Sequence, residues 1–162
     1  MAPEQEGGIQ TPEPELDEAL VERLDPSGQF AAAAGLGSQL EQGWEAAAAA
    51  LEGVSVLGAG QGPVDGVIVC GMGGSAIGAD VVRACAVDRL PVPFEVVRGY
   101  ELPAWASPRT LVVGVSHSGN TEETLSCVRG ALARECRVAA VTSGGELTAL
   151  ARERALPLVT VP

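Results

Sequence analysis

Two short segments of small and hydroxyl-bearing residues could bind a phosphate group. Residues 71–75 read Gly-Met-Gly-Gly-Ser, and residues 116–121 read Ser-His-Ser-Gly-Asn-Thr. Glycines let backbone N–H groups approach an anion closely, and hydroxyls add neutral donors. Each segment follows an apolar run and precedes a helix-like segment, whose first turn would supply further unpaired N–H groups. The chain therefore pairs two candidate phosphate-binding loops.

The second segment is the more specific of the two. The hydroxyl side chains of Ser116, Ser118 and Thr121 lie within six residues, enough to surround a phosphate monoester with neutral donors. Helix capping is the plainer interpretation of such residues, although a cap needs only one of them. A nucleophilic serine is a third interpretation. It is disfavoured because His117, the single histidine, adjoins the serines and no acid–histidine relay is visible.

The first segment by itself is open to other interpretations. Residues 71–76 also satisfy the relaxed dinucleotide-binding pattern G-x-G-x-x-G/A, and Arg98 stands near the end of the second predicted strand, where that pattern expects an acid. An arginine there is compatible with the 2′-phosphate of NADP. The glycines could also serve only a tight turn and close helix packing. The dinucleotide-binding and tight-turn interpretations of residues 71–76 therefore stay open, together with the interpretation as a phosphate loop.

Apolar runs of strand length alternate with amphipathic segments from Gly66 onward, a pattern typical of a parallel sheet covered by helices on both faces. The sequence therefore predicts an α/β fold with a doubly wound, five-stranded parallel sheet flanked by helices. The predicted strands are residues 67–70, 94–97, 111–115, 138–141 and 158–161. Both candidate loops follow carboxyl ends of strands, where open sheets bind ligands. The loops converge if the first and third strands are neighbours.

A helical lead is predicted before this sheet. The predicted organisation is a flexible acidic arm over residues 1–15, a helical lead over residues 16–60 and a domain over residues 61–162. In the lead, the predicted core residues are Leu40, Trp44 and Leu51. Two later helices are predicted to start at capping boxes formed by Asn120 with Glu123 and by Ser143 with Glu146.

Composition excludes several classes of function. The net charge is −11, from 10 Lys and Arg residues against 21 Asp and Glu, so nucleic acid and anionic membranes are not expected partners. Lysine is absent, which excludes a Walker A phosphate loop and Schiff-base chemistry within this chain. No apolar stretch approaches the roughly 18 residues that span a bilayer, and we expect a cytoplasmic protein.

The cysteines and the histidine do not predict a metal site. Cys70, Cys85, Cys127 and Cys136 show no C-x-x-C spacing and lie in or beside apolar segments, so we expect reduced, buried thiols. One histidine cannot form a metal centre alone. We therefore expect no metal. We also expect no cofactor, and the two candidate loops predict a small phosphorylated molecule as the ligand.

Three segments together resemble the sugar isomerase (SIS) domain. They are residues 67–80, 97–103 and 115–124, and the last contains the string Ser-x-Ser-Gly-Asn-Thr-x-Glu-Thr, which is the most specific part. These segments are similar to the amino-terminal half of the bifunctional phosphoglucose/phosphomannose isomerases of bacteria and archaea. The resemblance covers about residues 60–162 strongly and implies a flavodoxin-like SIS fold.

The resemblance also implies roles for individual residues. Those implied for the phosphate of a sugar phosphate are Ser116, Ser118, Gly119, Asn120 and Thr121. Those implied for the sugar are Gly73, Gly74 and Ser75. His117 stands where the family often has tyrosine, so we expect a difference in substrate affinity rather than in chemistry.

Aldose–ketose isomerisation needs a carboxylate base, a group that assists ring opening and a cation near the enediolate. The available acids are Glu101, Glu122 and Glu123, and the last two are expected to serve the start of a helix. The resemblance implies that the catalytic glutamate, histidine, lysine and arginine come from a second SIS half or the segment just before it. The catalytic residues of this chain are therefore unknown.

We expect this chain to be the sugar-phosphate-binding domain of a glucose-6-phosphate/mannose-6-phosphate isomerase, incomplete as a catalytic unit on its own. Its expected partners are a sugar phosphate and either a second SIS half or further copies of itself. One alternative is a stand-alone SIS module that senses a phosphosugar and regulates a partner. The other is the NADP-binding domain considered above.

Overall fold

The computed structural model describes residues 17–52 and 62–161. The chain divides after Leu40 into two compact units. The predicted arm over residues 1–15 lies outside the described residues, and so does the predicted boundary between residues 60 and 61.

The lead is helical over most of its described length. Its helices are α1 (Glu18–Leu24), α2 (Gln29–Ala34) and α3 (Leu36–Ala50). Helix α1 starts at Asp17, whose carboxylate accepts a first-turn backbone N–H at 2.7 Å, and Gly35 separates α2 from α3. Leu40 and Trp44 are exposed and Leu51 is half-buried. The prediction that Leu40 and Trp44 belong to a core is wrong, because α3 buries none of its residues.

The second unit is built on a parallel sheet. Its strands are β1 (Gly66–Cys70), β2 (Phe94–Val97), β3 (Thr110–Ser116), β4 (Arg137–Thr142) and β5 (Leu158–Thr160). They are ordered β2-β1-β3-β4-β5, and every neighbouring pair is parallel. All five predicted strands are present, with bounds within one residue of those predicted. The predicted doubly wound α/β fold is confirmed.

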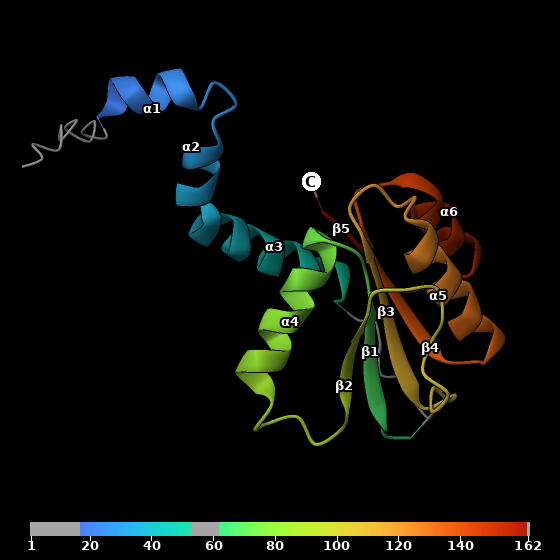
Figure 1. Cartoon of the computed structure of the whole chain (residues 1–162). Helices are drawn as coiled ribbons and strands as arrows, with labels where there is room; N and C mark the ends of the chain where they lie inside the picture. Colours follow the sequence, from blue (N-terminus) through green and yellow to red (C-terminus); the bar gives the residue numbers. More distant parts are fainter. Residues whose placement is uncertain (1–16, 53–61, 162) are drawn as a thin grey trace, which may run out of the picture. The chain divides into compact units, whose positions relative to one another are not determined.

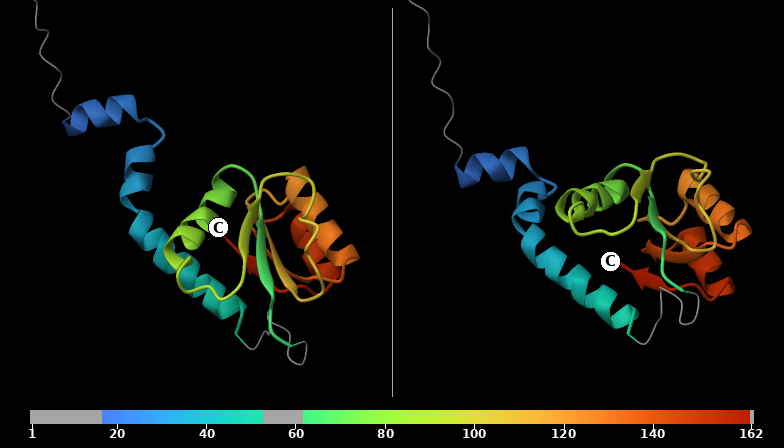
Figure 2. Two further views of the ribbon diagram at one scale, coloured as in Figure 1. Left: turned by 60° about the horizontal axis from the view of Figure 1, so that its bottom comes forward. Right: turned by 90° about the horizontal axis from the view of Figure 1, so that it is seen from below.

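Helices cover the two faces of this sheet unequally. They are α4 (Gly74–Ala86), α5 (Glu122–Ala133) and α6 (Gly145–Glu153). Figures 1 and 2 show α4 on one face and α5 with α6 on the other. The core lies on the second face, where Ile68, Val112, Val128 and Leu147 are completely buried. Successive strand residues point to opposite faces, so Val113 belongs to the α4 side and is only half-buried.

The cysteines lie mostly in this core. Cys70, Cys127 and Cys136 are buried, as predicted, whereas Cys85 on α4 is exposed, contrary to the prediction. All four are free thiols. A hydrogen bond with Cys127 and burial together raise the pKa of the Cys70 thiol, and burial raises the pKa of Cys136. Both thiols are therefore kept protonated.

Candidate functional site

The two candidate loops meet at one edge of the sheet. The first follows β1 and the second follows β3, and these strands pair directly, with Cys70 opposite Gly114. A Cβ atom at Gly71 would lie only 3.0 Å from the carbonyl oxygen of Val115. The structure thus meets the condition that the sequence left open, that the first and third strands are neighbours. Because α4 and α5 leave toward opposite faces, the loops flank the point where a doubly wound sheet forms its ligand crevice (Figure 2).

The first loop exposes backbone at the start of α4. Gly73 has a φ of +51° and is the N-terminal cap of α4, and no side chain caps this end. Gly73 and Gly74 are exposed, with open space where a side chain would stand, and Ser75 is half-buried. The positive φ favours glycine at position 73. A ligand can therefore approach the main chain closely at this end of the helix.

The second loop is organised around a pair of hydroxyl groups. The Oγ of Ser116 and the Oγ1 of Thr121 lie 2.8 Å apart, and the N–H of Gly119 donates to Ser116 Oγ at 3.1 Å. Ser116 is almost completely buried and Thr121 is half-buried, whereas Ser118 and Asn120 are exposed. The loop is thus anchored by Ser116 and open to solvent at its other side.

Helix α5 begins directly after this loop without a side-chain cap. Its N-terminal cap is Thr121, which makes no capping hydrogen bond. The predicted capping box of Asn120 and Glu123 is wrong, because Asn120 lies before the cap and its Oδ1 accepts the backbone N–H of Glu146 instead, at 3.0 Å. The first turn of α5 is therefore free of a local side-chain cap.

The predicted capping box at the next helix is also wrong. Helix α6 has Gly144 as its N-terminal cap, and no side chain of its own caps it. The hydroxyl of Ser143 donates to the carbonyl oxygen of His117 at 2.6 Å. Ser143 and Asn120 thus bridge two loops rather than capping the helices that follow them.

The charged groups around the loops are mainly acidic and paired. Glu122 and Glu123 occupy the first turn of α5, and the hydroxyl of Tyr100 lies 3.4 Å from Glu122 Oε2. Repulsion from Glu123, partial desolvation and repulsion from Glu122 raise the pKa of Tyr100 above its ordinary value. Arg98, which the NADP alternative requires, is ion-paired with Asp80 of α4. The loops therefore offer a ligand neutral donors rather than a cation.

A hollow of about 580 Å³ adjoins the two loops on the α4 side of the sheet. It is lined by Gly74, Ser75, Gly78, Val115, His117, Val141 and Val161. Residues implied for the sugar thus lie beside His117, while Ser116 points to the opposite face because side chains alternate along β3. Ser75 therefore lines the hollow, whereas the Ser116 side chain points away from it.

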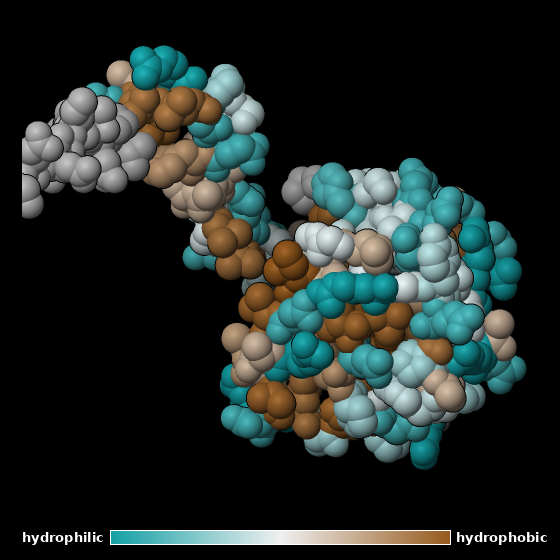
Figure 3. Space-filling view, in the orientation of Figure 1, coloured by the Kyte–Doolittle hydropathy of each residue, from teal (hydrophilic) through white to brown (hydrophobic). Residues whose placement is uncertain are grey.

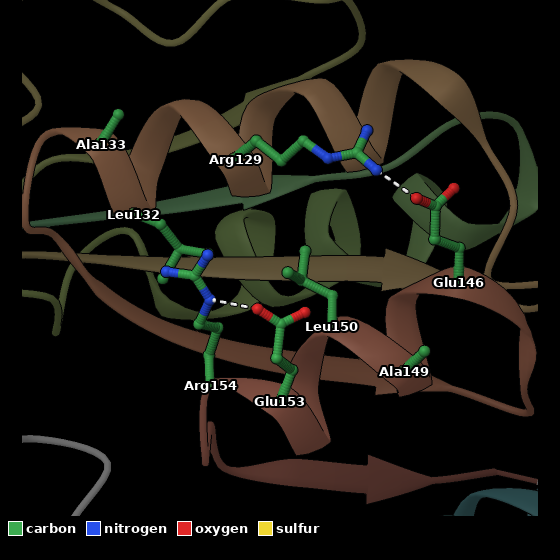
Figure 4. Close-up of a pocket in the computed structure, with 8 residues that line it drawn as sticks. All are labelled: Arg129, Leu132, Ala133, Glu146, Ala149, Leu150, Glu153 and Arg154. Carbon is green, nitrogen blue, oxygen red and sulfur yellow. Dashed lines mark hydrogen bonds and ion pairs between the residues drawn. The ribbon is translucent and has the colours of Figure 1, made fainter.

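A separate pocket of about 510 Å³ lies between α5 and α6 (Figure 4). Leu132 and Leu150 are part of its lining, with the Arg129–Glu146 and Arg154–Glu153 ion pairs at its rim. None of the residues implied for the sugar phosphate lines it.

Among the described residues, no group of three or more His, Cys, Asp and Glu side chains is placed to hold a metal ion. Nor does the described part of the chain contain a helix that is long and apolar enough to cross a membrane.

Comparisons with known proteins support the sequence resemblance. No protein-family model matches the chain. The chain is 41% identical over 99 residues to the bifunctional phosphoglucose/phosphomannose isomerase of Caldicellulosiruptor bescii, covering 61% of this chain and 29% of the relative. It is 38% identical over 101 residues to the enzyme of the same name from Aquifex aeolicus, covering 62% and 32%. A D-glucosamine-6-phosphate 4-epimerase of Sulfolobus acidocaldarius is 37% identical over 93 residues, covering 57% and 29%.

Solved structures share the architecture. Tagatose-6-phosphate ketose/aldose isomerase from Escherichia coli matches with a TM-score of 0.55 at 20% identity, over 77% of this chain and 35% of that one. The Vibrio vulnificus NanR protein complexed with ManNAc-6P matches with a TM-score of 0.55 at 18% identity, over 87% and 53%. The chain has the sugar isomerase (SIS) fold. The predicted resemblance to bifunctional phosphoglucose/phosphomannose isomerases is confirmed, and the chain spans about a third of the length of those relatives.

Sequence reasoning missed one segment at the edge of the sheet where the two candidate loops meet. The loop between β4 and α6 contacts the second candidate loop through Ser143 and Glu146. The signal was present in the Thr-Ser-Gly-Gly run at residues 142–145, which follows the strand next to β3. This run by itself predicts only a helix start, because capping residues and loop-bridging residues are of the same types.

Proposed function

We propose that this chain binds a hexose phosphate at the edge shared by β1 and β3, as the sugar-phosphate-binding domain of a glucose-6-phosphate/mannose-6-phosphate isomerase. The observation that carries the proposal is the hydroxyl pair of Ser116 and Thr121 at the uncapped start of α5, beside the glycine loop. Neutral hydroxyl and N–H donors at a helix start suit a phosphate ester.

Each loop is proposed to bind a different part of the ligand. The residues proposed for the phosphate are Ser116, Ser118, Gly119, Asn120 and Thr121. Those proposed for the sugar are Gly73, Gly74 and Ser75. The exposed glycine backbone at the start of α4 and the adjoining hollow support this division.

The substrate class has broader support than the reaction. Relatives of similar identity are named as isomerases of phosphoglucose and phosphomannose and as a 4-epimerase of D-glucosamine 6-phosphate. These names share a phosphorylated hexose and differ in the chemistry performed on it. We therefore propose that this chain supplies substrate binding, and that turnover requires catalytic groups from a second SIS half.

Calorimetric titration tests the proposal. We expect the chain to bind fructose 6-phosphate, and Thr121→Val to weaken binding by about tenfold or more, because a hydrogen bond to a charged group is lost. Ser126→Ala is the matched control, since its hydroxyl on α5 donates to the carbonyl of Tyr100 at 2.9 Å, outside the loop. Binding of NADPH without binding of a hexose phosphate would contradict the proposal.

A phosphosugar-sensing role is the second candidate. The NanR protein complexed with ManNAc-6P has this fold, and the chain spans 53% of it, a larger share than of the E. coli isomerase. A sensor would bind the ligand without turning it over, even when a second SIS unit is added. Isomerase activity of the combined units would exclude this role.

We also propose that this protein is cytoplasmic and that it pairs with a second SIS half or a further copy of itself. Hydrophobic residues gather over α4 (Figure 3), where Ile77, Val81 and Val82 are each more than half exposed. Apolar side chains at this spacing are typical of a face that another element covers. Sedimentation over a range of protein concentrations measures self-association directly.

A further inference from the structure

The loop between β4 and α6 is bonded to the proposed phosphate loop at several points. Both the backbone N–H and the hydroxyl of Ser143 donate to the carbonyl oxygen of His117, at 3.1 and 2.6 Å. The hydroxyl of Thr142 approaches the same oxygen at 3.4 Å. Both donors of Ser143 therefore converge on a single carbonyl of the phosphate loop, while the Thr142 hydroxyl is shared with the carbonyl oxygen of Gly144 at 3.0 Å.

The phosphate loop in turn caps α6. The Oδ1 of Asn120 accepts the N–H of Glu146 at 3.0 Å, and the carbonyl oxygen of Gly119 accepts the N–H of Leu147 at 2.9 Å. The first N–H groups of a helix lack partners within the helix. The phosphate loop supplies those partners for α6, so the two segments stabilise each other.

Two glycines allow this contact to be close. Gly119 has a φ of +70°, and a Cβ atom there would clash with the carbonyl oxygen of Gly144. Gly145 has a φ of +67°, and a Cβ atom there would clash with the carbonyl oxygen of Ser118 and crowd Asn120 Oδ1. Each glycine therefore lies against the backbone of the other loop in a conformation that disfavours a side chain.

We infer that the β4–α6 loop is a brace that positions the proposed phosphate loop, with Ser143 and Gly145 as positioning residues and Asn120 serving the brace through its Oδ1. The inference rests on the proposed function, because it assigns the brace to that same site. Neutral donors bind an anion well only when they are already oriented, and an unsupported loop loses affinity in becoming ordered.

Two alanine variants test the brace. We expect Gly145→Ala to weaken fructose 6-phosphate binding by about tenfold or more, because the backbone of residues 118–120 must move. Gly144→Ala is the matched control, because its φ of 175° suits any residue and nothing lies within 4 Å of its Cβ position. Equal affinities of the Gly145→Ala and wild-type proteins would overturn the inference.

The exposed Ser143 provides a second test that does not depend on Gly145→Ala folding. Ser143→Ala should weaken binding, and Ser143→Thr should restore it, because threonine keeps the hydroxyl that donates to His117. A threonine variant as weak as the alanine variant would count against the brace.

Hydrogen exchange in the ligand-free protein separates the brace from the proposed function. Ser143→Ala should speed exchange of the Glu146 and Leu147 amides, which donate to the phosphate loop, while amides in β1 stay unchanged. If the wild type binds no hexose phosphate, the proposed function fails. Unchanged exchange of both amides would overturn the brace, whether or not the wild type binds a hexose phosphate.

Discussion

Tyr100 is the residue that reports most directly on charge at the start of α5. It is the only tyrosine of the chain, and its hydroxyl lies 3.4 Å from Glu122 Oε2. The nearby carboxylates of Glu123 and Glu122 oppose formation of a phenolate. The same carboxylates flank the proposed phosphate loop, so the proposal requires the ligand to be held by local donors rather than by the surrounding field.

Titration of this phenol gives a prediction at the residue scale. We expect absorbance at alkaline pH to give a midpoint above the ordinary pKa of 10.0, and Glu123→Gln to bring it back toward that value. Because the raised pKa belongs to the folded state, the unfolded chain loses its proton first. The stability that the neutral phenol of Tyr100 contributes to the folded state is therefore intact below pH 10, and it falls as the pH rises toward the pKa of Tyr100 in the folded protein. Glu153→Gln on α6 is the control and should leave the midpoint unchanged.

At the scale of elements, the paired strands β1 and β3 are joined at both ends. Loops meet at the carboxyl edge, and Asp65 connects the strands at the amino edge. Its carboxylate accepts from Arg109 Nε at 3.1 Å and from the hydroxyls of Ser107 and Thr110 at 3.3 Å each. Thr110 is completely buried, so its hydroxyl has limited access to water as a substitute partner.

Removal of this carboxylate gives a prediction for the strand pair. We expect Asp65→Ala to lower the free energy of unfolding by about 1–2 kcal/mol, a value reduced because the side chain is about one-third exposed. Glu153→Ala breaks an exposed ion pair with Arg154 and should cost less than about 0.5 kcal/mol. Urea denaturation of both variants measures the difference. Equal losses would show that the Asp65 cluster does not join the strands.

For the whole molecule, the dominant property is a net charge of −11. A field of this sign repels a phosphate dianion, and the proposed site offers neutral hydroxyls and N–H groups. Ion pairing therefore contributes little to the proposed binding, which separates this chain from proteins that bind polyanions by counterion release.

The response to salt gives a prediction for the whole molecule. We expect affinity for fructose 6-phosphate to stay constant or to rise by about twofold between about 0.05 and about 0.3 M potassium chloride, because screening weakens the repulsion. Calorimetric titration at several salt concentrations measures this. A tenfold loss of affinity over the same range would mean that a cation such as Arg98, rather than neutral donors, holds the ligand.

The sequence by itself determined the sheet and the positions of the two candidate loops. Continuous apolar runs such as residues 111–115 are recognisable because a strand covered on both faces must be apolar throughout. The glycines at 73 and 119 were likewise visible, since backbone with a positive φ favours this residue.

Only the tertiary structure decided which strands are neighbours and what Asn120 and Ser143 do. Strand order depends on where the connecting helices pack, which local periodicity does not encode. Short polar side chains satisfy whichever backbone group is nearest, and in this protein those groups belong to another loop. Trp44 likewise shows that an apolar helical pattern indicates a face that can be buried, while burial itself requires a partner in space.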